Sequence, residues 1–171
     1  MLLARARIAA QRESVLARTE VEPVLERLVR VMRRLHPEKT FLLTVSPPGL
    51  VLAMEQQDVE ETVGNLLDNA ARYATEQVRV TVQSAPEGLQ GKDPGRRNWI
   101  SIDVDDDGPG LEPEQIAVAV KRGRRLDESK PGTGLGLSIV SEIAGEYQGT
   151  LDLSRGERGG LNARILLPAV S

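Results

Sequence analysis

The chain has 171 residues, of which 40% are hydrophobic and 27% are charged, and its net charge at pH 7 is −3. This length suits one well-buried domain with a short appendage, and the charge gives no general attraction to nucleic acid. The lack of cysteine excludes disulfides and thiolate metal sites, and one Trp, two Tyr and one Phe are too few for a base-stacking platform.

The first elements in chain order are two predicted helices. Residues 2–18 have the pattern of a basic helix with a thin apolar stripe. Thr19 followed by Glu22 resembles a capping box, which predicts that the second helix begins there and runs to about Leu35.

The rest of the chain alternates between strand and helix patterns. Apolar runs predict strands over residues 41–45, 50–53, 78–82, 99–104, 150–153 and 163–167. Helical spacing predicts helices over residues 55–74, 113–119 and 135–147. Residues 120–133 have no hydrophobic periodicity and are expected to form a mobile loop. Helices placed between β-hairpins predict an α+β fold: a two-layer sandwich of a mixed, mostly antiparallel sheet with helices on one face.

The helix expected over 55–74 has two different faces. At about 100° per residue, an apolar stripe faces the core, and it consists of Val59, Val63, Leu66 and Ala70. The opposite face carries Glu61, Asn65, Asn69 and Arg72. Asn is disfavoured inside helices, so two of them one turn apart suggest a function. A carboxylate, amide oxygens and a cation in a row suit a hydrated Mg²⁺ that carries a polyphosphate.

Two glycine-rich segments support the same interpretation. In Asp107-Gly108-Pro109-Gly110, glycine lets the backbone approach a planar ligand, and the Asp107 carboxylate can accept a hydrogen bond from an exocyclic amine such as that of adenine. An ordinary turn is the alternative. Residues 132–136, Gly-Thr-Gly-Leu-Gly, precede a helix and can bind phosphate through backbone N–H groups. Their spacing matches neither a P-loop nor a dinucleotide fingerprint.

Two other features have ordinary explanations beside functional ones. The basic run 121–125 is either a solvated loop or a source of cations that reach phosphate oxygens as the loop closes. His36, the single histidine, is either a phosphoacceptor or the last residue of a helix that ends before Pro37. The proline and the helix end favour the second interpretation. One histidine and no cysteine leave little basis for a zinc site.

In order and spacing, three segments resemble the N, G1 and G2 boxes of the GHKL ATPase superfamily, namely residues 65–70, 107–110 and 132–136. Within that superfamily the chain resembles the catalytic, ATP-binding domain of a bacterial sensor histidine kinase. Residues 121–140 are similar to the lid and G2 region of PhoQ-type kinases, and the likeness covers about residues 20–168. There are two departures. Val118 and Val120 stand where the family's F box often carries Phe, and the H box with its phosphoacceptor histidine is missing.

The resemblance implies that ATP and Mg²⁺ are the cofactors. It also implies roles for several residues of the helix expected over 55–74. Asn65 would supply its amide oxygen to Mg²⁺, and Glu61 would act as a base or orient the metal's water. Asn69 and Arg72 would contact phosphates. Tyr73 would lie against the adenine side of the pocket.

The same resemblance implies roles for the loops. Asp107, in the turn that contains Gly108 and Gly110, would bind the adenine amino group. Arg122 and Arg125 would belong to the ATP lid. The phosphates would be wrapped by the G2 segment, which consists of Gly132, Thr133, Gly134, Leu135 and Gly136.

The predicted function is transfer of the ATP γ-phosphoryl group to a histidine on a dimerisation domain outside this chain. Residues 1–18 are expected to be the remnant of a dimerisation-domain helix or linker, and residues 19–171 the catalytic domain. The expected partners are that dimerisation domain and a response regulator. We expect a monomeric cytoplasmic fragment of a homodimeric parent in the bacterial inner membrane. Two alternatives remain: an anti-sigma-factor-type serine kinase, and an ATP-binding switch module without transferase activity.

Overall fold

The computed structural model describes residues 17–96, 98–117 and 135–170. In chain order the elements are β1 (Thr19–Glu20), α2 (Val21–Leu35), β2 (Thr40–Ser46), β3 (Val51–Leu52), α3 (Gln56–Tyr73), β4 (Gln77–Ser84), β5 (Trp99–Asp106), α5 (Leu135–Glu146), β6 (Thr150–Arg155) and β7 (Leu161–Pro168). Residues 113–117 form a further short helical segment.

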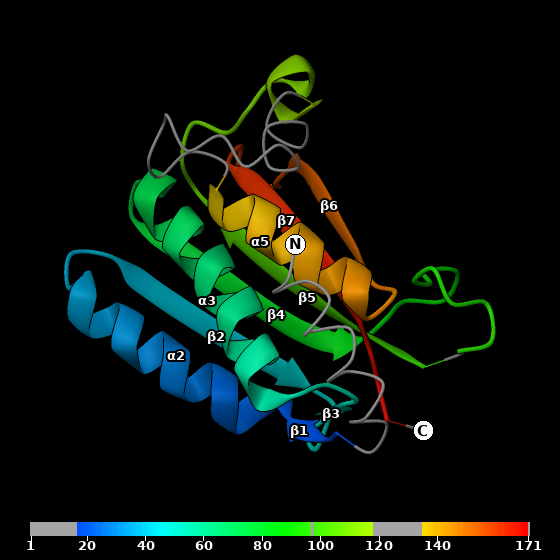
Figure 1. Ribbon diagram of the computed structural model, residues 1–171. Helices are drawn as coiled ribbons and strands as arrows, with labels where there is room; N and C mark the ends of the chain where they lie inside the picture. Colours follow the sequence, from blue (N-terminus) through cyan, green and yellow to red (C-terminus); the bar gives the residue numbers. More distant parts are fainter. Residues whose placement is uncertain (1–16, 97, 118–134, 171) are drawn as a thin grey trace.

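The main sheet has five strands in the order β2-β4-β5-β7-β6. β2 and β4 are parallel, and every other neighbouring pair is antiparallel. The three helices α2, α3 and α5 lie side by side across one face of this sheet (Figure 1). The predicted two-layer α+β sandwich with a mixed, mostly antiparallel sheet is therefore confirmed.

The core lies between the helix layer and the inner face of the sheet. The predicted stripe of α3 is buried, since Val59, Val63, Leu66 and Ala70 are at most 4% exposed. In β5, alternate residues point to the same face, and Ile100, Ile102 and Val104 join the core cluster with the helices. Each such side chain contributes about 1.5–3 kcal/mol to the stability of the fold through burial.

The predicted capping box at Thr19 is wrong. Thr19 lies in β1, which pairs antiparallel with β3, and its side-chain hydroxyl donates to the Met54 carbonyl at 2.7 Å. Glu20 is the N-cap residue of α2 and makes no side-chain capping hydrogen bond. A hydroxyl residue three positions before an acidic one fits both arrangements, and pairing with a distant strand decides between them.

Several strands extend beyond their predicted ranges, and the extension that bears on the site is that of β5. This strand continues through Asp105 and Asp106, two residues beyond the predicted end at residue 104. The expected helix over 2–18, the lid over 120–133 and the glycines of 132–134 lie outside the described residues, except that Ala17 and Arg18 precede β1 without helical structure. Among the described helices, none has the length and apolar character that crossing a membrane requires.

Candidate nucleotide-binding site

Three segments of the predicted site meet at one end of the sandwich: the second half of α3, the turn after β5 and the first turn of α5 (Figure 1). The approach is close. A Cβ atom added to Gly108 would lie 2.1 Å from the Tyr73 carbonyl oxygen, and one added to Gly136 would lie 3.3 Å from Asn65 Oδ1. The fold therefore brings together the residues that the three motifs supply within the described ranges.

The polar face of α3 forms one wall of this site. The Asn65 amide nitrogen donates to the Glu61 carbonyl at 2.6 Å, which directs Oδ1 away from the helix toward the start of α5. Glu61 and Asn65 also line a groove of about 280 Å³ between α2 and α3. Asn69 is half-buried, whereas Arg72 and Tyr73 are exposed at the end of the helix. The predicted residues of α3 thus share one accessible face.

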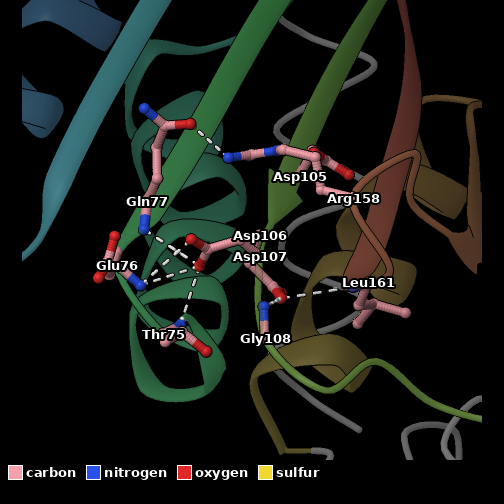
Figure 2. A network of polar contacts seen from close by, with 9 residues as sticks. All are labelled: Thr75, Glu76, Gln77, Asp105, Asp106, Asp107, Gly108, Arg158 and Leu161. Atoms are coloured by element: carbon pink, nitrogen blue, oxygen red, sulfur yellow. Dashed lines mark hydrogen bonds and ion pairs between the residues drawn. The ribbon is translucent and has the colours of Figure 1, made fainter.

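Three consecutive carboxylates, Asp105 to Asp107, lie at the end of β5 and the start of the turn that follows, and each has different partners (Figure 2). Asp107 Oδ1 accepts hydrogen bonds from the backbone N–H groups of Thr75, Glu76 and Gln77 at 2.9, 3.0 and 3.1 Å. Desolvation opposes the charge of Asp107, but these N–H groups and Arg158 outweigh it and lower the pKa of its carboxyl group. Asp107 therefore fixes the connection between α3 and β4, a role that the sequence did not suggest.

Asp106 is the carboxylate that faces the helix layer. It follows Ile102 and Val104 at alternate positions of β5, so its side chain points to the same face of the sheet, and it is only 2% exposed. Its Oδ1 accepts from Gly108 N at 2.9 Å and from Leu161 N at 3.4 Å, while Oδ2 makes no hydrogen bond with the described residues. Burial raises the pKa of Asp106, the two N–H groups oppose this, and the neighbouring carboxylates add to it.

The glycines of this turn are needed for contacts within the protein. Gly108 lies against the Tyr73 carbonyl, as described above. Gly110 has a φ of +72°, and a Cβ atom there would lie 2.2 Å from the Gly159 carbonyl oxygen. In the structure these glycines allow close approach of α3 and of the β6–β7 turn, while the expected close approach of a planar ligand stays a prediction.

The donor set fits a magnesium ion that is carried by a polyphosphate. No group of three or more His, Cys, Asp or Glu side chains suited to a metal occurs within the described ranges. Mg²⁺ commonly keeps several waters and takes one or two protein oxygens together with substrate phosphates. Asn65 Oδ1 has the chemistry of such an oxygen, and it lies beside the N-terminal end of α5, where backbone N–H groups and the helix dipole favour anions.

The predicted site also includes residues of the lid and of the G2 segment. Arg122, Arg125, Gly132, Thr133 and Gly134 lie outside the described residues, as do Val118 and Val120. Asp106, in contrast, is a buried site residue that the sequence analysis missed. The alternation of Ile100, Ile102 and Val104 would have placed it inward if the predicted strand had been extended by two residues.

Comparison with known proteins agrees with this geometry. Residues 54–171 match the family described as histidine kinase-, DNA gyrase B-, and HSP90-like ATPase. The chain belongs to this ATPase family. The match begins just before α3 and continues through all three predicted motifs, so the predicted family membership is confirmed.

Similar proteins of this ATPase family are sensor kinases. The sensor protein kinase CarS of Pseudomonas aeruginosa is 39% identical over 144 residues, which are 84% of this chain and 30% of CarS. The sensor protein PhoQ of Escherichia coli is 30% identical over 147 residues, which are 85% of this chain and 28% of PhoQ. The chain therefore spans less than a third of the length of these curated relatives.

Solved structures extend the likeness to the fold. The structure of the mycobacterial sensor histidine kinase MprB aligns with a TM-score of 0.68 at 25% identity, and the alignment covers 89% of this chain and 96% of that chain. The chain is thus an ATP-binding domain of the histidine kinase type in sequence and in fold.

Proposed function

We propose that this ATPase domain binds ATP with Mg²⁺ and transfers the γ-phosphoryl group to a histidine on the dimerisation domain of a parent sensor kinase. The observation that carries the proposal is the meeting of the Asn65 amide oxygen, the N-terminal end of α5 and the buried Asp106 at one end of the sandwich. Phosphoryl transfer depends mainly on positioning and charge stabilisation, and these groups supply both.

We assign adenine recognition to Asp106 in place of Asp107. Asp106 faces the helix layer and has an oxygen, Oδ2, without a hydrogen bond to the described residues. The oxygens of Asp107 are engaged by the backbone of residues 75–77. A hydrogen bond from the exocyclic amine of adenine to Asp106 Oδ2 would satisfy a buried carboxylate, which otherwise costs stability.

The polyphosphate end of the site would involve α3 and α5. Asn65 Oδ1 would hold a Mg²⁺ ion, which neutralises phosphate charge when it is bound. Asn69 and Arg72 follow on the same face of α3 and would contact phosphate oxygens. The lid arginines Arg122 and Arg125, with residues 132–136, remain candidates for the remaining phosphate contacts, and Tyr73 for the adenine side.

We propose that Glu61 acts on the acceptor histidine. It is half-buried and lines the groove between α2 and α3 together with Asn65. A histidine that enters from this groove would meet the carboxylate before it reaches the metal. Glu61 would then accept the imidazole proton or orient the ring as the phosphoryl group is transferred.

The lengths of the relatives support a larger parent protein. We propose that residues 1–18 are the remnant of a dimerisation-domain helix or linker, that the parent is a homodimer in the bacterial inner membrane with this domain in the cytoplasm, and that a response regulator receives the phosphoryl group.

Single-turnover transfer tests the proposal most directly. Labelled ATP, Mg²⁺ and this domain would be mixed with a separately purified dimerisation domain of the parent, and acid-labile label on histidine would be followed. We expect transfer by the wild type, slow transfer with near-normal ATP binding by Glu61→Gln, and neither by Asn65→Ala. ATP binding without any transfer by the wild type would instead indicate a nucleotide-holding module.

A further inference from the structure

The β6–β7 turn, residues 156–160, and the first residue of β7, Leu161, hold the end of β5 from both faces of the sheet. On the inner face, Leu161 N donates to Asp106. On the outer face, Arg158 Nη2 donates to Asp105 Oδ2 at 3.2 Å. The two backbones are also close, because a Cβ atom on Gly160 would lie 2.0 Å from the Asp106 carbonyl oxygen. The turn therefore leaves little freedom for the strand end that carries Asp106.

Arg158 continues past β5 to the start of β4. Its Nη1 donates to the Gln77 side-chain carbonyl, so one guanidinium joins β4 and β5 at the ends that border the site (Figure 2). The guanidinium lies against the sheet, since the Arg158 side chain is 23% exposed and that of Asp105 is 16% exposed. Arginine suits this position because its planar fork can bond two acceptors at once.

The two acceptors of Arg158 belong to the two segments that support the proposed nucleotide contacts. Gln77 begins β4, and its backbone N–H is held by Asp107, which also binds the residues that follow α3. Asp105 directly precedes Asp106. Arg158 also places a positive charge beside Asp105 and Asp107, and after the backbone N–H groups it is a further group that lowers the pKa of Asp107.

We infer that Arg158 is a positioning residue for adenine recognition, acting through Asp105 and Gln77 from the face of the sheet opposite the nucleotide. This inference rests on the proposed function, because it assumes that Asp106 binds the base. Arg158 itself touches no ligand. It fixes the end of β5 and the exit of α3 relative to each other, so that Asp106 Oδ2 keeps its direction.

The test compares ATP with inosine triphosphate, which carries a carbonyl oxygen in place of the adenine amino group. Dissociation constants would be measured by calorimetry for the wild type, Arg158→Met, Arg158→Lys and Arg155→Met, at a temperature where circular dichroism shows each protein folded. Arg155 is the matched control, since it lies in the same hairpin, is 59% exposed and pairs only loosely with Glu112 at 3.7 Å.

We expect Arg158→Met to weaken ATP binding about tenfold and inosine triphosphate binding by less, so that the preference for adenine shrinks. Arg158→Lys should recover part of the preference, because lysine keeps the charge but bonds one acceptor at a time. Arg155→Met should bind both nucleotides like the wild type. A purely stabilising role would lower the melting temperature and leave the preference unchanged.

Two outcomes would overturn the inference: an unchanged ATP affinity in Arg158→Met, or an equal loss for both nucleotides. If Arg158→Met does not fold, Gln77→Leu tests the inference instead. This variant removes the Gln77 side-chain acceptor of Arg158 and keeps the Arg158–Asp105 ion pair. It should shift the preference in the same direction by about threefold, and no shift would contradict the inference. A wild type that binds no ATP would refute the proposed function instead.

Discussion

Two buried carboxylates lie at opposite ends of α3, and their surroundings differ. Asp58, near the start of the helix, is 8% exposed, and its Oδ2 accepts a hydrogen bond from the Tyr147 hydroxyl at 2.5 Å. Asp106, beside the other end, is 2% exposed, and its Oδ2 has no partner among the described residues. Burial alone therefore does not identify a site residue. The carboxylate with an unused oxygen is the one suited to a ligand.

The two carboxylates, Asp58 and Asp106, also differ in the parts of the fold that they connect. Tyr147 follows α5, so its bond to Asp58 ties the end of α5 to the start of α3, and the Thr62 hydroxyl donates to the Asp58 carbonyl one turn later. Burial, and then the hydrogen bond to Asp58, raise the pKa of Tyr147, so its hydroxyl stays protonated and can donate. This end of the helix layer is a structural connection, whereas the other end is organised around Asp106.

The largest expected effect is that of Asp106→Asn on nucleotide affinity. Asparagine can still accept from Gly108 N and Leu161 N through Oδ1, but it would present an N–H₂ group to the adenine amine. Loss of a charged hydrogen bond costs about 1.5–3 kcal/mol, which weakens ATP binding by roughly 10- to 150-fold. Calorimetric titration with ATP measures this loss.

The same variant should not lose stability. Because burial raises the pKa of Asp106, its ionised form is less favourable in the folded protein than in the unfolded chain. Removing the charge should leave the free energy of unfolding at pH 7 unchanged or higher, as urea denaturation would show. A large drop in stability together with the loss of binding would mean that Asp106 is structural, like Asp58.

Tyr147→Phe should lose stability but keep its affinity for ATP, the opposite of what is expected for Asp106→Asn. Without the hydroxyl, Asp58 stays buried with one hydrogen-bond donor fewer, and we expect a loss of about 1–3 kcal/mol in the free energy of unfolding. ATP affinity, measured well below the melting temperature, should stay within about twofold of the wild type. If ATP binding fell as far as in Asp106→Asn, the two ends of α3 would not be separable.

Asp107→Ala should have a smaller effect on stability, of about 1–2 kcal/mol, because the N–H groups that it leaves can partly be hydrated. The lowered pKa of Asp107 means that its ionised form stabilises the fold above the unfolded-state pKa. This contribution is lost as the pH falls through the folded-state pKa. The stability difference between wild type and variant should therefore shrink as the pH is lowered below about 4. A difference independent of pH would exclude this role of the carboxylate.

Local patterns predicted much of the fold and of the α3 wall of the site. The spacing of Val59 and Val63 against Asn65 and Asn69 separated the buried face from the polar one, because helix geometry alone decides that division. The Thr19 capping box failed because a short-range pattern was overruled by pairing with β3.

The roles of Asp106, Asp107 and Arg158 depend on contacts between segments far apart in the sequence. Arg158 reaches Gln77, which lies 81 residues earlier, and no local spacing indicates such a contact. The sequence feature that could have identified Asp106 is its position two residues after Val104, in the alternating pattern of inward-facing residues. It became informative once β5 was known to extend beyond Val104, since the strand then places Asp106 on the same face as the core residues.

The most direct test of the central claim, that Asp106 recognises the base, compares the affinities for ATP and inosine triphosphate in the wild type, Asp106→Asn and Asp107→Asn. The wild type should prefer ATP. Asp106→Asn should lose that preference or reverse it, because its side-chain amide can donate to the inosine carbonyl, and Asp107→Asn should retain it. Loss of the preference in Asp107→Asn with a normal preference in Asp106→Asn would contradict the account.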